Sequence, residues 1–340
     1  MTGIGGPAGG QGKRRSHVAQ ADGDSSAPTE PIGAGAPAAV LLAPAKLTIS
    51  LAVTGTRADG YHLLDAEMVT LDFADTLVLT DGDGLEVSLE HLRPRGDGTA
   101  AAGSGLASAG SELASAGSAP LTPRVPGGDD NLVRRALRAV GRRAHVVLVK
   151  RIPPGAGLGG GSADAAAVLR WAGCHDLEVA ARLGADVPFC VVGGRARVTG
   201  IGEVVEPLPS VERHFVLVLP PFGVDTASVY RAADALVSAR GGRWEHKHDG
   251  PTRGAGTWVG NDLEEAALVV EPRLAIWRDA LAAATGATPR LAGSGSTWFV
   301  EGRAEDLGVA SLDVLTVGNE TGRLVATRTL PPADDGGVPG

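Results

Sequence analysis

The sequence of 340 residues has few of the features that mark a secreted or membrane-embedded protein. Two cysteines are too few for a disulfide framework, so a reducing cytoplasm is the simplest setting. No apolar run reaches the ~18 residues of a membrane-spanning helix, which predicts no membrane partner. A basic cluster at 13–15 precedes an apolar stretch at 32–45, but the two are not adjacent and the stretch contains prolines, unlike a signal peptide. We therefore predict a cytoplasmic protein.

Aromatic residues make up only 4% of the chain, so its core must be built from Val, Leu and Ala. Acidic residues outnumber basic ones, and the net charge is −8. This charge argues against a nucleic-acid partner, because a surface that binds nucleic acid needs clustered Lys and Arg. A local basic pocket for an anionic small molecule remains compatible with this charge. The chain has fifty glycines, far more than average usage. Flexible segments and ligand binding by the backbone are two explanations for this excess.

Composition divides the chain into ordered and low-complexity parts. Residues 1–37 are rich in Gly, Ala, Pro and Ser and predict a disordered leader. Residues 94–128 have a similar composition and predict a flexible insertion. Residues 240–258 predict a polar loop, and the last ten residues predict a tail.

The remaining segments mix strand and helix patterns and predict an α+β protein. Predicted strands are 40–53, as two short strands broken at Pro44, then 66–73, 75–80, 85–89, 145–150, 189–192, 196–199, 215–219, 290–292 and 297–300. Predicted helices are 163–172, 176–183, 226–239, 263–270 and 272–285, with one more that begins after the N-cap Asn131.

A glycine-rich run, Pro154 to Ser162, lies between a predicted strand and a predicted helix. Glycines let backbone N–H groups approach a phosphate, and the N-terminus of the following helix adds partial positive charge. The run lacks the Gly-Lys-Ser/Thr of a Walker A loop and does not fit the dinucleotide-binding fingerprint. Ser162 and Asp164 stand at the helix start, where Ser162 caps the helix or contacts a phosphate or its magnesium. The alternative, a flexible linker, is weak because a linker would not join a well-formed strand to a well-formed helix.

Two charged residues are candidates for phosphoryl-transfer chemistry. Asp186, before Val-Pro, is either a turn or cap residue or the carboxylate that a kinase needs to accept or orient a substrate hydroxyl. Lys46 is either a strand-end lysine that extends to solvent or a cation that stabilises charge on the transferred phosphoryl group.

Two short motifs are candidates for ligand contacts. Tyr61 and His62 follow a turn and are either a surface pair or a face on which a base stacks and hydrogen-bonds. The sequence Gly-Ser-Gly-Ser at 293–296 is either a plain turn or a second backbone cradle for phosphates.

These motifs occur together in one order: Pro-Ala-Lys-Leu at 44–47, Arg-Ala-Asp-Gly-Tyr-His at 57–62, Asp-Asn-Leu at 130–132, the glycine-rich segment at 153–166, Leu-Gly-Ala-Asp-Val-Pro at 183–188 and Gly-Ser-Gly-Ser at 293–296. Each motif is weak alone, but the ordered set resembles the 4-diphosphocytidyl-2-C-methyl-D-erythritol kinases, a family within the galactokinase/homoserine kinase/mevalonate kinase superfamily. The resemblance covers residues 40–325, and the Ala-Asp-Gly-Tyr-His segment favours this family over its relatives.

The resemblance implies a two-lobed α+β fold with a ribosomal-protein-S5-like N-terminal lobe at 38–200, a C-terminal lobe at 201–330 and a tail at 331–340. It also implies transfer of the γ-phosphate of ATP, with Mg²⁺, to the 2-hydroxyl of a cytidine-diphosphate-linked methylerythritol. This reaction is a step of the non-mevalonate isoprenoid pathway.

The resemblance further implies the roles of individual residues. Lys46 and Asp186 match the catalytic pair, and Tyr61 and His62 match residues that hold the cytosine. Thr48, Gly293 and Ser294 fall on the substrate side. The predicted ATP-binding residues are Asn131, near the adenine, and Pro153, Pro154, Gly155, Ala156, Gly157, Leu158, Gly159, Gly160, Gly161, Ser162 and Ala163.

Four features depart from the family pattern. Thr48 replaces a usual Asn, and Ala163 replaces a usual Ser, which predicts one fewer hydroxyl near the phosphates. The segment before Leu183 is short by most of a helix, and 94–128 is an insertion. Spacing singles out no acidic magnesium ligand, with Ser162 as the one candidate. The alternatives are a related kinase for homoserine, mevalonate or a sugar, which offer no base to Tyr61 and His62, and a non-catalytic nucleotide-binding homologue.

Overall fold

A computed structural model of the chain describes residues 39–89, 128–242, 244 and 260–332. The predicted leader and most of the predicted insertion, polar loop and tail lie outside these ranges. Helices and strands both occur throughout the described part, which confirms the α+β prediction.

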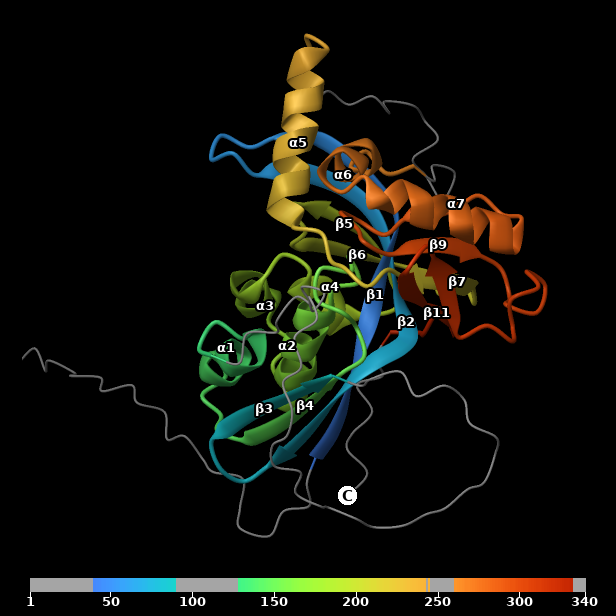
Figure 1. The fold of residues 1–340 in the computed structure, drawn as a ribbon. Coiled ribbons are helices and arrows are strands. Elements are labelled where there is room, and N and C mark those ends of the chain that lie inside the picture. The colour runs from blue at the N-terminus through green and yellow to red at the C-terminus, as the bar shows by residue number, and fades with distance from the viewer. Residues whose placement is uncertain (1–38, 90–127, 243, 245–259, 333–340) are drawn as a thin grey trace, which may run out of the picture.

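The first sheet has six strands in the order β3-β4-β2-β5-β6, with β1 paired to β2. Its strands are β1 (Ala39–Thr56), β2 (His62–Thr80), β3 (Gly84–Leu89), β4 (His145–Lys150), β5 (Arg195–Gly200) and β6 (Val204–Leu208). β1 and β2 form a long antiparallel hairpin that runs along the molecule (Figure 1). The predicted lobe boundary at residue 200 falls between β5 and β6, two paired strands of this sheet.

The prediction that Pro44 breaks the first strand is wrong. β1 continues through this residue, and a register shift between Pro44 and Lys46 absorbs the disturbance. Proline is tolerated here because a bulge leaves its missing N–H outside the ladder. The two strands predicted for 66–80 are likewise one strand, β2, which begins at His62.

Four helices pack on the first sheet: α1 (Leu132–Ala139), α2 (Gly160–Trp171), α3 (Leu177–Leu183) and α4 (Val187–Val192). A core rich in alanine, valine and leucine lies between these helices and the sheet. The strand predicted at 189–192 is wrong, because this apolar run forms the buried helix α4 with Pro188 in its first turn. A short apolar run does not distinguish a buried strand from a buried helix.

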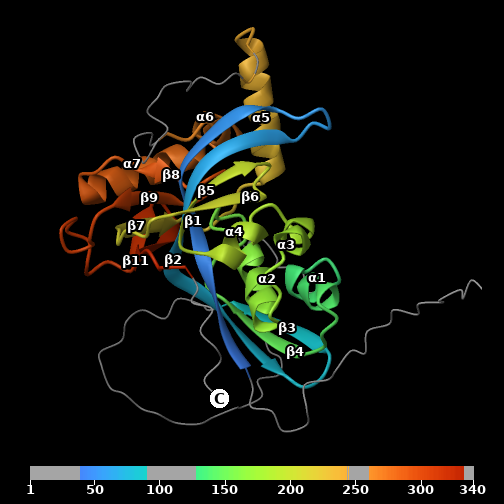
Figure 2. The ribbon, with the colours of Figure 1, turned by 180° about the vertical axis from the view of Figure 1, so that it is seen from behind.

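The second sheet has the order β10-β11-β7-β9-β8, formed by β7 (His214–Leu219), β8 (Arg290–Leu291), β9 (Trp298–Glu301), β10 (Val314–Val317) and β11 (Glu320–Arg328). It packs with α5 (Thr226–Ala239), α6 (Glu264–Val270) and α7 (Arg273–Thr285) around a second core that contains Trp277 and Trp298. Seen from both sides, α5 stands beside the far end of the β1–β2 hairpin (Figure 2). The sequence did not predict β6, β10 or β11.

A third core joins the two sheets. Leu47 and Leu71 from the hairpin pack with Phe215 and Phe299 from the second sheet, and all four side chains are fully buried. The glycine-rich segment contributes Ala156 and Leu158 to the same cluster. The loop is therefore anchored where the two sheets meet. No helix in the described ranges is long and apolar enough to cross a membrane.

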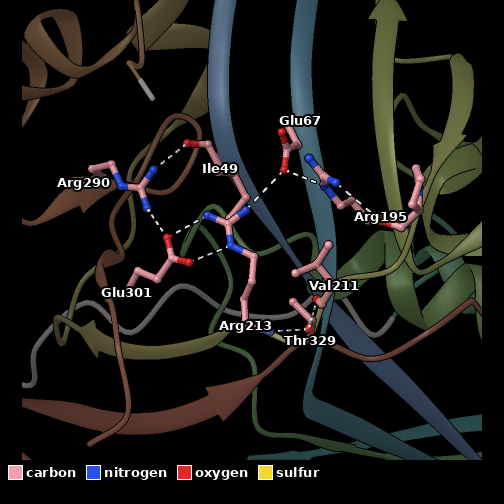
Figure 3. Close-up of polar contacts among 9 residues, drawn as sticks. Ile49, Glu67, Arg195, Val211, Arg213, Arg290, Glu301 and Thr329 are labelled. Carbon is pink, nitrogen blue, oxygen red and sulfur yellow. Dashed lines mark hydrogen bonds and ion pairs between the residues drawn. The ribbon is translucent and has the colours of Figure 1, made fainter. Parts of the chain in front are cut away.

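A polar network crosses the same junction on another side (Figure 3). Arg213, just before β7, holds Glu301 of the second sheet through two hydrogen bonds of 2.8 and 2.7 Å. The same guanidinium reaches Glu67 of β2 at 3.2 Å. Arg290 joins Glu301 to the carbonyl oxygen of Ile49 in β1. These charge-assisted contacts fix the two sheets relative to each other.

Candidate active site

One cavity of about 820 Å³ collects nearly all the residues predicted from the sequence. Such a volume is typical of a small-molecule site. Ala163 does not line this cavity. The predicted residues that do are Lys46, Thr48, Tyr61, His62, Asn131, Pro153, Pro154, Gly155, Ala156, Gly157, Leu158, Gly159, Gly160, Gly161, Ser162, Asp186, Gly293 and Ser294.

Lys46 and Asp186 form an ion pair inside this cavity. The Lys46 ammonium lies 3.3 Å from a carboxylate oxygen of Asp186 and donates a hydrogen bond of 3.1 Å to the hydroxyl of Thr48. Lys46 is only 6% exposed, so it does not extend to solvent as the alternative interpretation required. Asp186 occupies the N-cap position of α4, but its side chain makes no capping hydrogen bond. Its carboxylate, 31% exposed, is therefore available in the cavity.

The glycine-rich loop packs so closely at two of its glycines that a side chain there would collide with its neighbours. Gly157 has a φ of +78°, and a Cβ there would lie 2.2 Å from the carbonyl oxygen of Ala292. Gly159 has a φ of +66°, and a Cβ there would lie 2.7 Å from the Lys46 side chain. The Lys46 N–H also donates to the carbonyl of Leu158. The loop is thus fixed against Lys46, with its backbone on the cavity wall.

Helix α2 begins three residues earlier than predicted, at Gly160, and its N-cap is the left-handed Gly159. Ser162 therefore lies inside the first turn and does not cap the helix. The first-turn N–H groups have no partner within the helix and are available to an anion. Ala163 is 1% exposed and packs in the first core, so its methyl group does not line the cavity.

A buried charged cluster lies directly beneath the loop. The Lys150 ammonium contacts the carboxylates of Asp75 and Asp164, and all three residues are at most 4% exposed. Burial lowers the pKa of Lys150, but the two carboxylates outweigh this effect and raise it. Burial raises the pKa of Asp164, with Lys150 opposing. One Asp164 oxygen, Oδ1, is buried without a hydrogen-bonding partner in the described structure.

Asp75 connects this cluster to the start of the loop. Its Oδ1 accepts hydrogen bonds from the backbone N–H groups of Arg151 and Ile152, at 2.5 and 2.8 Å. Both residues lie immediately before the glycine-rich segment. A lysine and two aspartates from distant parts of the chain therefore set the position of the loop.

The Gly-Ser-Gly-Ser segment at 293–296 packs against the glycine-rich loop. The N–H of Ser296 donates to the carbonyl of Gly155 at 3.0 Å. Asn261 holds the second loop by a hydrogen bond of 2.7 Å to the carbonyl of Gly293, and the Ser294 hydroxyl lies 2.9 Å from that of Thr226. The segment is an anchored wall of the cavity, not an isolated surface turn.

Aromatic side chains gather at the end of the cavity next to α5. His62 stacks on Tyr230 with ring centres 4.7 Å apart and an interplanar angle of 27°. Tyr61 is 58% exposed and lies under the guanidinium of Arg57. On another wall, the Asn131 side chain accepts a hydrogen bond from the N–H of Val133 as the N-cap of α1.

Sequence reasoning missed several cavity residues that come from elsewhere in the chain. Tyr230 and its neighbour one turn later, Asp234, lie on one face of a predicted helix, but nothing in their spacing indicated a ligand. Asn261 does not line the cavity but holds the 293–296 loop that does. It had a detectable signal, because Asn before a predicted helix is typical of an N-cap, and its Oδ1 does accept the N–H of Leu263. Its second contact, to the 293–296 loop, could not be predicted.

Comparisons with known proteins show which family the chain resembles. Residues 131–194 match the family described as GHMP kinases N terminal domain. The chain is 35% identical over 272 residues to the 4-diphosphocytidyl-2-C-methyl-D-erythritol kinase of Paracoccus denitrificans, covering 76% of this chain and 84% of that protein. It is 36% identical over 273 residues to the protein of the same name from Ruegeria pomeroyi, covering 76% and 86%.

A solved structure supports the same relationship. The crystal structure of a 4-(cytidine 5′-diphospho)-2C-methyl-D-erythritol kinase matches with a TM-score of 0.55 and 28% identity, over 86% of this chain and 99% of that one. More than a third of the aligned residues are identical in each of these curated relatives, and the alignments cover most of both chains. The chain therefore belongs to the 4-diphosphocytidyl-2-C-methyl-D-erythritol kinase family.

Proposed function

We propose that this chain transfers the γ-phosphoryl group of ATP to the 2-hydroxyl group of 4-diphosphocytidyl-2-C-methyl-D-erythritol. Membership of the kinase family supports the reaction. The observation that carries the proposal for this site is the Lys46–Asp186 pair, 3.3 Å apart, on the wall of the cavity that also contains the phosphate-binding backbone. The two free cysteines of the described chain support a cytoplasmic location.

In the proposed reaction the substrate hydroxyl oxygen attacks the γ-phosphorus. The new phosphorus–oxygen bond forms as the bond between the γ-phosphorus and the β–γ bridging oxygen breaks, and ADP leaves. Asp186 aligns the hydroxyl and accepts its proton, and Lys46 stabilises the negative charge on the transferred group. Thr48 orients Lys46 by accepting a hydrogen bond from its ammonium. The substitution of the usual Asn therefore keeps a polar partner for the lysine.

The ATP phosphates are proposed to lie against the glycine-rich loop and the start of α2. Gly157 and Gly159 leave no room for side chains, so the backbone itself forms the surface that a phosphate would meet. The first-turn N–H groups of Gly160, Gly161 and Ser162 supply donors, and the helix contributes partial positive charge. The residues present fit a nucleotide triphosphate.

Mg²⁺ is the metal that the family implies, and two groups here fit it. Asp164 has a buried carboxylate oxygen without a partner, and the half-buried Ser162 hydroxyl lines the same cavity. The described residues contain no group of three His, Cys, Asp or Glu that could cage a metal. This agrees with Mg²⁺, which is usually bound by one or two carboxylates, by waters and by substrate phosphates. When bound, the ion would neutralise phosphate charge.

Specificity for a cytidine-containing acceptor is proposed to reside at the aromatic end of the cavity. Tyr61, His62 and Tyr230 lie there, and an exposed tyrosine ring offers a face for a nucleobase. Homoserine and mevalonate carry no base, so these three rings would be unused with them. Gly293 and Ser294 lie on the wall near Lys46 and are proposed to contact the same substrate.

The decisive test is the variant Asp186→Asn assayed with ATP and the cytidylyl substrate. Loss of the proton acceptor is expected to lower kcat by about 10²- to 10⁴-fold, while ATP binding measured by calorimetry stays within about 2-fold. The wild-type enzyme assayed in parallel with mevalonate and homoserine should consume ATP only with the cytidylyl substrate. Near-normal turnover by Asp186→Asn, or equal turnover of all three acceptors, contradicts the proposal.

A further inference from the structure

His62 is held by three neighbours at the aromatic end of the cavity. Its Nε2 lies 2.7 Å from Oδ1 of Asp234, its ring stacks on Tyr230, and the Trp244 ring meets it edge-on with centres 6.0 Å apart. The indole N–H of Trp244 donates to the same oxygen of Asp234 at 2.7 Å. The His62 side chain is 12% exposed, whereas that of Asp234 is 49% exposed.

Tyr230 and Asp234 are four residues apart on α5, so both project from one face of this helix towards the hairpin end that carries His62. The hairpin end and α5 lie side by side in both views (Figures 1 and 2). His62 and Asp234 are separated by 172 residues in the chain. Only the tertiary structure brings them together.

The contact defines which nitrogen of His62 carries a proton. An ionised carboxylate has no proton to donate, so Nε2 of His62 must be the donor in its contact with Asp234. The indole N–H of Trp244 can only donate, so Oδ1 of Asp234 is the acceptor in that contact too. In the neutral ring the other nitrogen, Nδ1, is then an acceptor. Nothing within the described ranges hydrogen-bonds to Nδ1 of His62.

We propose that Asp234 is a positioning residue for base specificity: by holding the Nε2 proton of His62, it keeps Nδ1 as an acceptor that selects a base with an amino donor. Cytosine presents an amino group at the ring position where uracil presents a carbonyl oxygen. A fixed acceptor therefore pairs with cytosine, and with uracil it faces a second acceptor. This inference rests on the proposed function and extends it to a residue outside the catalytic pair.

Two variants separate the acceptor of Asp234 from its negative charge. Asp234→Asn keeps an oxygen that can accept from His62 and Trp244, but it has no charge. Asp234→Leu is of similar size and has no acceptor. Asp279, an acidic residue 68% exposed on α7, supplies the matched controls Asp279→Asn and Asp279→Leu.

The probes are CMP and UMP, titrated into the full-length protein by calorimetry with saturating ADP to fill the ATP site. The wild type is expected to prefer CMP. Asp234→Leu should lose about 10-fold in this preference, as expected for one hydrogen bond of discrimination. Asp234→Asn and both Asp279 variants should stay within about 3-fold of the wild type. In turnover assays Asp234→Leu should raise KM for the cytidylyl substrate and leave KM for ATP unchanged.

Nitrogen NMR of histidine-labelled protein reads the protonation directly, with His62→Gln to assign the signal. The wild type and Asp234→Asn should show His62 protonated at Nε2, and Asp234→Leu should show a shift towards the other tautomer. This readout does not depend on catalysis.

The inference is overturned if Asp234→Leu keeps the full CMP preference or the Nε2-protonated signal. In either case the proposed function still stands. Absence of any CMP preference in the wild type, with no turnover of the cytidylyl substrate, overturns the proposed substrate as well. A fall in CMP preference in Asp234→Asn as large as in Asp234→Leu would assign the effect to charge and also overturn the inference.

Discussion

Replacing Lys150 by Met is expected to be among the most destabilising single changes at this site. The substitution nearly preserves the volume of the side chain but leaves the carboxylates of Asp75 and Asp164 buried without their cation. Asp75 keeps two backbone donors, so the uncompensated charge falls mainly on Asp164, whose second oxygen already has no partner. Removing one partner of a buried ion pair typically costs about 3–5 kcal/mol.

Urea-induced unfolding of the wild type, Lys150→Met, Asp164→Asn and the double variant forms a complete cycle. Asp164→Asn alone should cost less than Lys150→Met, because it leaves Lys150 paired with Asp75. The double variant should recover at least about half of the loss, since only one buried carboxylate then remains. Lys150→Met should also raise KM for ATP, because Asp75 holds the backbone immediately before the loop. A cost below about 1 kcal/mol for Lys150→Met, or a double variant no more stable than Lys150→Met, would refute this account of the cluster.

Three further predictions follow from the loop, the junction between the sheets and the core. Gly157→Ala should abolish ATP binding, because the new Cβ would lie 2.2 Å from a backbone carbonyl oxygen. The control Gly141→Ala has a similar φ of +62° but open space around the Cβ. It should lower the free energy of unfolding by only about 1–2 kcal/mol and leave ATP binding intact. Glu301→Gln should cost about 1 kcal/mol at neutral pH. The hydrogen bonds from Arg213 lower the pKa of Glu301 in the folded protein. The contribution of Glu301 to stability is therefore fully present above its pKa in the unfolded chain, and it disappears as the pH falls through its pKa in the folded protein. The wild type and Glu301→Gln should accordingly converge in acid unfolding curves. Burial raises the pKa of Cys190 to about 12, so iodoacetamide at pH 8.5 should label this thiol only after denaturation, as mass spectrometry of the peptide would show; rapid labelling of the native protein would contradict its burial.

Local signals predicted much of the secondary structure correctly. The helix that starts after Asn131 was identified by N-cap chemistry, and the side chain does cap α1. The strand at 145–150 and the helix at 226–239 have the predicted bounds, because each has a clear pattern and clear ends. The errors fell where such signals conflict. Pro44 suggested a break that a bulge avoids, and the apolar run at 189–192 suited a strand as well as a helix.

Motif order along the chain was sufficient to indicate the kinase family, and it singled out the glycine-rich loop and the pair Lys46 and Asp186 as candidate site residues. Composition and spacing carry that information because glycines, a lysine in an apolar strand and an aspartate before Val-Pro are each visible locally. The partners of these residues are not. Asp75 and Lys150 are 75 residues apart, and His62 and Asp234 are 172 apart, so their contacts depend on how the sheets pack. The sequence by itself determined which groups could act on a phosphate. Only the tertiary structure decided which side chains neutralise and orient those groups. The reason is that these contacts form between helices and strands whose local sequence patterns are independent of one another.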